Sequence, residues 1–205
     1  MTMRAKIIGL LLLAGWGLTG AEVARGQCEQ TLQNESAPDI EYVGLRPDGR
    51  RAWVGQTFTT TSDGHFESAA FLVKADLFPL AGVAPLGTGD LLRCTLLDGN
   101  DFPIASVTAP LAAGFALQWV TFDFAPLTLG LAAGPLSVRV GAEADGYLWV
   151  GTSGDVVAGQ LTLGDETSAF TSSQRDTSFR VAWNTCTPVV AVEGQTWGGV
   201  KALFH

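Results

Sequence analysis

The alternation of residue types over positions 118–124 constrains the fold of this chain more than any other feature. Apolar residues occupy every second position, with polar or amphipathic residues between them: Val120, Phe122 and Phe124 against Trp119, Thr121 and Asp123. This period of two is that of a β-strand with one buried face. A partner strand is expected at 136–140, after a connection rich in glycine, alanine, proline and leucine. Because such a pair cannot bury its apolar face alone, the segment predicts two packed sheets.

The rest of the chain supplies strands for both sheets. Turn signals, such as those at 47–49 and 98–101, separate segments rich in β-branched and aromatic residues. This spacing predicts an all-β fold, a two-sheet antiparallel β-sandwich that is jelly-roll-like. Strands are expected at 53–60, 67–75, 90–97, 104–108, 116–124, 136–141, 147–150 and 178–184, with weaker signals at 42–43, 160–163 and 168–171.

The first 26 residues have the organisation of an export signal. Arg4 and Lys6 form a basic start, and roughly a dozen mostly apolar residues follow at 7–18, too few to span a bilayer. Small residues favour cleavage after Gly26, with cleavage after Ala21 as the alternative. An uncleaved N-terminal membrane anchor is the other reading of the same residues.

Four regions are therefore expected along the chain. They are a signal peptide at 1–26, an N-terminal segment at 27–52 that joins the sandwich, the β-sandwich at 53–186, and a linker and tail at 187–205. The net charge of −8 argues against nucleic acid and anionic membranes as partners. No segment after the signal is long and apolar enough to span a membrane. We expect a secreted, extracellular or cell-surface protein.

The three cysteines all lie after the signal, where export brings them into an oxidising compartment. Cys28 opens the mature chain and Cys186 follows the last strand. Since the two ends of a sandwich are often close, the preferred disulfide is Cys28–Cys186. Cys94 is in phase with two flanking leucines and is predicted to be a buried free thiol. Lipidation of Cys28 is disfavoured because Gln27, and not a small residue, precedes it.

Several short motifs follow one another between about residues 53 and 184. They are Gln56-Thr57-Phe58-Thr59, Leu92-Arg93-Cys94-Thr95-Leu96, Trp119-Val120-Thr121-Phe122-Asp123-Phe124, Gly146-Tyr147-Leu148-Trp149 and Phe179-Arg180-Val181. Together they resemble the jelly-roll-like domains of secreted bacterial proteins called choice-of-anchor domains, type R in particular. The resemblance implies a non-catalytic module with a structural or attachment role, and it brings no catalytic residues with it. Its partner would be a surface protein or an extracellular glycan.

Exposed aromatic residues are the strongest functional signal. By phase Trp119 points away from the core together with Asp123, and Tyr147 and Trp149 share one face of a later strand. Sugar-binding sandwiches stack saccharides on flat aromatic rings beside a few polar groups. Trp119, Tyr147, Trp149 and Asp123 are therefore the predicted ligand-binding residues of a carbohydrate-binding module. In the alternative reading these aromatic residues only fill or cover the sandwich.

Catalysis is not expected. A glycoside hydrolase would need two facing carboxylates, and the nearest pair, Glu143 and Asp145, flanks a glycine turn. A nucleophilic triad would have to use His65, which lies in a turn signal, and no nucleophile elbow accompanies it.

Calcium is the one cofactor that the sequence allows. Asp98, Asn100 and Asp101 supply oxygen ligands of the kind that Ca²⁺ prefers, within one short turn. The same residues are also typical of a hairpin turn without an ion.

Overall fold

The computed structural model describes residues 28–74, 82–113, 117–155, 157–172 and 174–186. The predicted signal peptide and the predicted tail at 187–205 lie outside these residues. Within them the chain forms strands and one short 3₁₀ helix, η1 (Ala125–Leu127). No helix in this described part is long and apolar enough to cross a membrane.

The strands form two layers, as predicted, and every strand pairing is antiparallel. The first layer, sheet A, is built around β4, which pairs with β14 along one edge and with β7 along the other. Next to β14 lies β1, and β10 continues along β4 beyond the end of β14, joined in turn by β2 and β13. The bounds are β1 (Glu29–Asn34), β2 (Asp39–Leu45), β4 (Gly64–Lys74), β7 (Leu117–Asp123), β8 (Gly130–Leu131), β10 (Tyr147–Gly154), β13 (Arg175–Thr177) and β14 (Phe179–Asn184).

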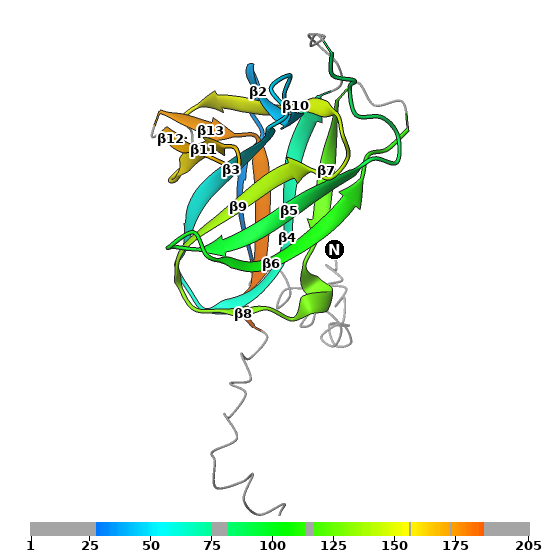
Figure 1. The fold of residues 1–205 in the computed structure, drawn as a ribbon. Coiled ribbons are helices and arrows are strands. Elements are labelled where there is room, and N and C mark those ends of the chain that lie inside the picture. The colour runs from blue at the N-terminus through cyan, green and yellow to red at the C-terminus, as the bar shows by residue number, and fades with distance from the viewer. Residues whose placement is uncertain (1–27, 75–81, 114–116, 156, 173, 187–205) are drawn as a thin grey trace, which may run out of the picture.

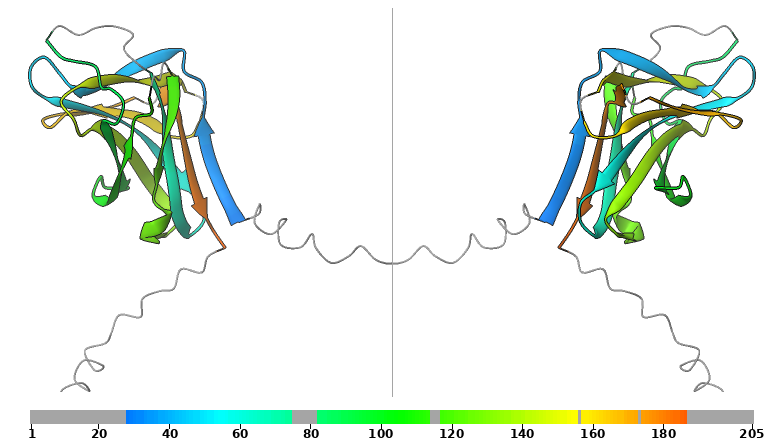
Figure 2. Two further views of the ribbon diagram at one scale, coloured as in Figure 1. Left: turned by 90° about the vertical axis from the view of Figure 1, so that its right-hand side faces the viewer. Right: turned by 90° about the vertical axis from the view of Figure 1, so that its left-hand side faces the viewer.

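The second layer, sheet B, has the strand order β12-β11-β3-β9-β5-β6. Its outer face is toward the viewer in Figure 1, and Figure 2 shows the layers from the side. Pairing of β2 with β3 connects the layers at one corner. The bounds are β3 (Arg51–Thr60), β5 (Leu91–Asp98), β6 (Pro103–Pro110), β9 (Gly134–Ala142), β11 (Gln160–Gly164) and β12 (Ala169–Ser172).

The core lies between the layers and follows the period-two pattern. Val120, Phe122 and Phe124 are 4%, 0% and 0% exposed, so the predicted buried face is confirmed. Burying each phenylalanine contributes about 1.5–3 kcal/mol. The strands at 118–124 and 136–140 do not pair with each other, however, because β7 belongs to sheet A and β9 to sheet B. The two segments lie in opposite layers, and their connection crosses from one layer to the other.

The N-terminal segment is more regular than its polar composition suggests. Only a short edge strand is expected near Tyr42 and Val43, but 28–52 contains β1 and β2, and β2 pairs with β10 over residues 39–44 and with β3 at Gly44 and Leu45. The backbone at Gly44 has a φ of +111°, and a Cβ there would overlap the carbonyl of Gly146. Only glycine suits this position, where β2 passes against the backbone just before β10.

The predicted disulfide is confirmed. Cys28 and Cys186 are bonded, with their Cα atoms 5.0 Å apart and 158 positions between them in sequence. The bond lies at the end of the β1–β14 pair, which runs along one edge of sheet A (Figure 2). Cys94 is a free thiol with no exposed surface, as predicted, and burial raises its pKa far above the usual value.

Candidate functional site

Trp119 lies on the outer face of sheet A, as its phase predicted. It is half-buried, and the guanidinium carbon of Arg180 stands 4.1 Å from the centroid of its ring. Arg180 is held there by an ion pair with Glu35, with Nη2 to Oε1 at 2.5 Å. One ring face of Trp119 is therefore occupied by a cation. Asp123, on the same strand, is exposed and accepts a hydrogen bond from the backbone N–H of Ala125 at 3.0 Å, which caps the turn into η1.

Tyr147 and Trp149 come together, but they do not form an open stacking surface. Tyr147 is 1% exposed, so this predicted stacking residue has no free ring face. Its ring is stacked on Tyr42 at 5.7 Å between centroids, and Trp149 meets both tyrosines edge-on. The backbone of Tyr147 also donates a hydrogen bond to the carbonyl of Ala84 and accepts one from the N–H of Leu86. Trp149 is half-buried and lies on the other side of β4 from Trp119, offset by two residues, so ordinary strand geometry puts the two Cα atoms about 12 Å apart.

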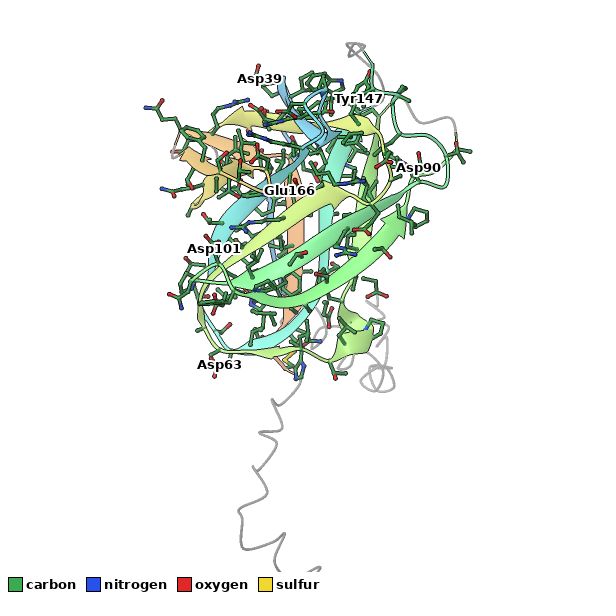
Figure 3. All side chains as sticks on the ribbon, viewed as in Figure 1. Asp39, Asp63, Asp90, Asp101, Tyr147 and Glu166 are labelled. Carbon is green, nitrogen blue, oxygen red and sulfur yellow. A yellow bond between two sulfur atoms is a disulfide. The ribbon has the colours of Figure 1, made fainter. Side chains whose placement is uncertain are left out.

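Tyr42 is the member of this cluster that the sequence did not indicate. Its hydroxyl donates to the carbonyl of Leu45, and burial is the main cause that raises its pKa to about 12. The rings of Tyr42, Tyr147 and Trp149 form a packed aromatic cluster at the upper end of the sandwich, where Tyr147 is labelled in Figure 3. These rings pack against one another where β2 pairs with β10, so they offer little ring surface to a ligand.

The predicted calcium residues lie in the β5–β6 hairpin. Asp98 accepts hydrogen bonds from the backbone N–H groups of Asn100 and Phe102, at 2.8 and 2.9 Å, and these bonds close the turn. Asp101 adopts a positive φ of 65° and forms an ion pair with Arg139 at 2.6 Å. In the part of the chain that the structure describes, no three His, Cys, Asp or Glu side chains converge on one point. Calcium at this turn stays a prediction.

The two carboxylates considered for hydrolysis are each held by a different arginine. Glu143 is bonded to Arg93, and Asp145 to Arg51. Glu143 lies in the lining of a groove on sheet B, and Asp145 does not. The two acids therefore do not face each other across one cavity.

The groove on the outer face of sheet B was not indicated by the sequence. Trp53 on β3, Gly141 on β9 and Arg93 on β5 are adjacent in one cross-strand row, and Arg139 and Thr95 are adjacent in the next. Because Gly141 has no side chain, these neighbours surround a depression with a volume of about 240 Å³. The alternation of Val138, Arg139 and Val140 could have placed Arg139 outward. No local signal brings β3, β9 and β5 side by side.

Two buried or partly buried aspartates have structural roles. Asp176 has no exposed surface and accepts hydrogen bonds from the side-chain amide of Gln56 at 2.7 Å and from the backbone of Val157 at 2.9 Å. Asp165 accepts from the backbone and hydroxyl of Thr167, each at 2.8 Å. The backbone N–H of Thr167, first among several donors, holds the pKa of Asp165 well below its usual range. The charge of Arg50 acts in the same direction.

Comparison with known proteins shows only distant similarity. No family model and no curated protein sequence matches the chain. Among solved structures, the enzymatically active domain of tailspike protein 4 from bacteriophage CBA120 matches 60% of this chain and 18% of its own, at 12% identity and a TM-score of 0.33. The structure of the infectious bursal disease virus Gt strain matches 77% of this chain and 36% of its own, at 9% identity and a TM-score of 0.31.

A family two carbohydrate esterase from Cellvibrio japonicus matches 73% of this chain and 35% of its own, at 13% identity and a TM-score of 0.26. The chain thus covers well under half the length of each of these three proteins. Similarity at this level carries no argument about what the chain binds or does.

Proposed function

We propose that this chain is a non-catalytic, exported β-sandwich module with a structural or attachment role outside the cell. The observation that carries the proposal is the Cys28–Cys186 disulfide, which joins the first and the last residue of the described sandwich. Disulfides of this structural kind persist in oxidising compartments and are rare in the cytosol. The signal-like residues at 1–26 and the resemblance to choice-of-anchor domains agree with the same role.

The absence of a catalytic role is part of this proposal. Its support is that Glu143 and Asp145 are each bonded to an arginine, and that Asp176 and Asp165 receive hydrogen bonds from the chain itself. The hydrogen bonds to buried Asp176 and Asp165 stabilise the fold, whereas Glu143 and Asp145 are each paired with a different cation.

Expression of the full chain in a bacterial host tests the proposal. We expect a mature protein that begins at Gln27, is found outside the cytoplasm, and carries the Cys28–Cys186 bond, as read by mass spectrometry of the intact protein and of its non-reduced peptides. Beads coated with the exported protein should adhere to cells or to extracellular matrix of the source organism. A full-length, reduced protein in the cytoplasm would contradict the proposal.

Carbohydrate binding is the second candidate. Two half-buried indoles, Trp119 and Trp149, share the outer face of sheet A, and an indole face suits the C–H face of a sugar. Arg180 over Trp119 and the buried position of Tyr147 leave this surface smaller than the sequence suggested. Glycan-array binding of the exported protein, repeated with Trp119→Ala and Trp149→Ala, is the test. Array binding that both substitutions leave unchanged would exclude this surface.

A further inference from the structure

We propose that the groove over Gly141, on the outer face of sheet B, binds a carboxylate-bearing sugar residue of the uronic acid class. The inference rests on the extracellular role proposed above. It adds a place on the fold and a chemical class of ligand. The groove lies on the opposite layer from Trp119 and Trp149, so the two surfaces can be tested separately.

The shape of the groove follows from a single glycine. Trp53 and Arg93 are the cross-strand neighbours of Gly141, and their side chains stand on either side of the gap that it leaves. A Cβ built at Gly141 meets only the Cβ of Trp53, at 3.8 Å, which is an ordinary contact. The space of about 240 Å³ lies just below the range of about 300–1,000 Å³ that encloses drug-sized ligands. It suits one sugar ring.

The groove places two guanidinium groups close together on an otherwise acidic protein. Its lining includes Arg93, Arg139 and one acid, Glu143, whereas the chain has a net charge of −8. The Arg139 guanidinium carbon lies 4.2 Å from the centroid of the Trp53 ring, so the cation is held at the wall of the groove. Two guanidinium groups at one depression can bind an anionic ligand that displaces the carboxylates now paired with them.

Both arginines are paired with carboxylates that a ligand can replace. Arg93 binds Glu143 through two hydrogen bonds, Nε to Oε1 at 2.6 Å and Nη2 to Oε2 at 2.9 Å. Arg139 binds Asp101, which lies at the hairpin tip (Figure 3). The Asp101 side chain is 66% exposed. Both pairs are in contact with water, which screens them, and a ligand carboxylate has to compete with the two-bond Arg93–Glu143 contact. The buried Nε of Arg139 has no acceptor among the described residues. A ligand carboxylate offers the planar, bidentate partner that guanidinium prefers.

The surroundings favour a saccharide over a peptide. The groove crosses β3, β9 and β5, and β9 and β5 are each paired on both edges, so a peptide strand finds no free backbone there. Hydroxyl groups continue along the same outer face, with Thr95 and Ser106 bonded to each other at 2.8 Å. Sugar hydroxyls can exchange hydrogen bonds with such side chains without needing a strand edge.

Isothermal titration of the mature exported protein with a galacturonic acid tetramer tests this inference. We expect saturable binding that weakens as salt is raised, because the contact is ionic. Arg139→Gln should raise Kd at least about tenfold, and Arg139→Lys about threefold, since lysine keeps the charge but loses the fork. Gly141→Val should abolish binding by filling the groove. The matched control is Gly154→Val, at a strand glycine whose Cβ meets nothing within 4 Å, and it should leave Kd unchanged.

Three outcomes would overturn the inference: no binding of the tetramer at millimolar concentration, Gly141→Val binding as well as the unaltered protein, or a hexaglutamate peptide binding as tightly as the tetramer. Thermal melts of each variant show whether the protein is folded. Failure here leaves export and the disulfide untouched, so it is distinguishable from failure of the proposed function. A cytoplasmic, reduced protein would instead remove the extracellular role on which the inference rests.

Discussion

Removing the Cys28–Cys186 disulfide should lower the free energy of unfolding by a large amount. The bond joins residues 158 positions apart, and the chain-entropy relation for a loop of this length gives about 5 kcal/mol at 25 °C. Much of the total stability of a typical domain, about 5–15 kcal/mol, would then depend on this single cross-link. The effect acts on the unfolded chain, because the β1–β14 pairing that precedes the bond stays available after reduction.

Urea denaturation of the Cys28→Ser/Cys186→Ser variant measures this effect. With an m-value of about 2 kcal/mol/M, the midpoint should fall by about 2 M or more. Adding reductant to the unaltered protein should give the same shift, while the double variant should not respond to reductant. Cys94 is buried, forms no disulfide and is kept in the double variant. Any effect of the reductant on this thiol would therefore appear in the double variant as well. A midpoint that moves by less than about 0.3 M would refute the reasoning.

Three further substitutions test the core, the buried polar network and the acid dependence. Phe122→Ala should lower the free energy of unfolding by about 3–5 kcal/mol, while Thr121→Ala, on the exposed face of the same strand, should change it by less than about 0.5 kcal/mol in the same urea titration. Equal effects would contradict the assigned core face. Gln56→Leu removes a donor from buried Asp176 and should cost about 2–4 kcal/mol by calorimetry, and a loss below about 1 kcal/mol would show that the network contributes little. Because the folded pKa of Asp165 lies below the unfolded value of about 3.9, its contribution is present above that pH and is lost as the pH falls toward the folded pKa. Asp165→Asn should therefore flatten the pH dependence of stability below about pH 4, and an unchanged curve would argue against the assigned hydrogen bonds.

Much of the fold could be predicted because period-two alternation reports burial directly. Val120, Phe122 and Phe124 were assigned to the core from phase alone, and the structure buries all three. The pairing of Cys28 with Cys186 followed from the closeness of the two ends of a sandwich. Phase does not say which strands pair, and so the strands at 118–124 and 136–140 were expected to be neighbours, although they belong to opposite sheets.

The candidate site was less predictable, because an outward-facing residue can still be covered by another segment. Tyr147 points to the outer side of its strand, yet Tyr42 and the backbone of residues 84–86 bury it. The groove over Gly141 depends on three strands that are far apart in sequence, with register deciding that Trp53 and Arg93 flank the same glycine. Neither relation has a local sequence signal.

The indole N–H resonances of the folded protein provide the most direct measurement of where it binds a ligand. Trp53 lines the groove on sheet B, whereas Trp119 and Trp149 lie on the outer face of sheet A. In a ¹H–¹⁵N titration of the purified, disulfide-bonded protein with the galacturonic acid tetramer, we predict that the Trp53 signal shifts progressively while the signals of Trp119 and Trp149 stay in place. Shifts of Trp119 or Trp149 with a stationary Trp53, or no shift of any indole, would contradict the account.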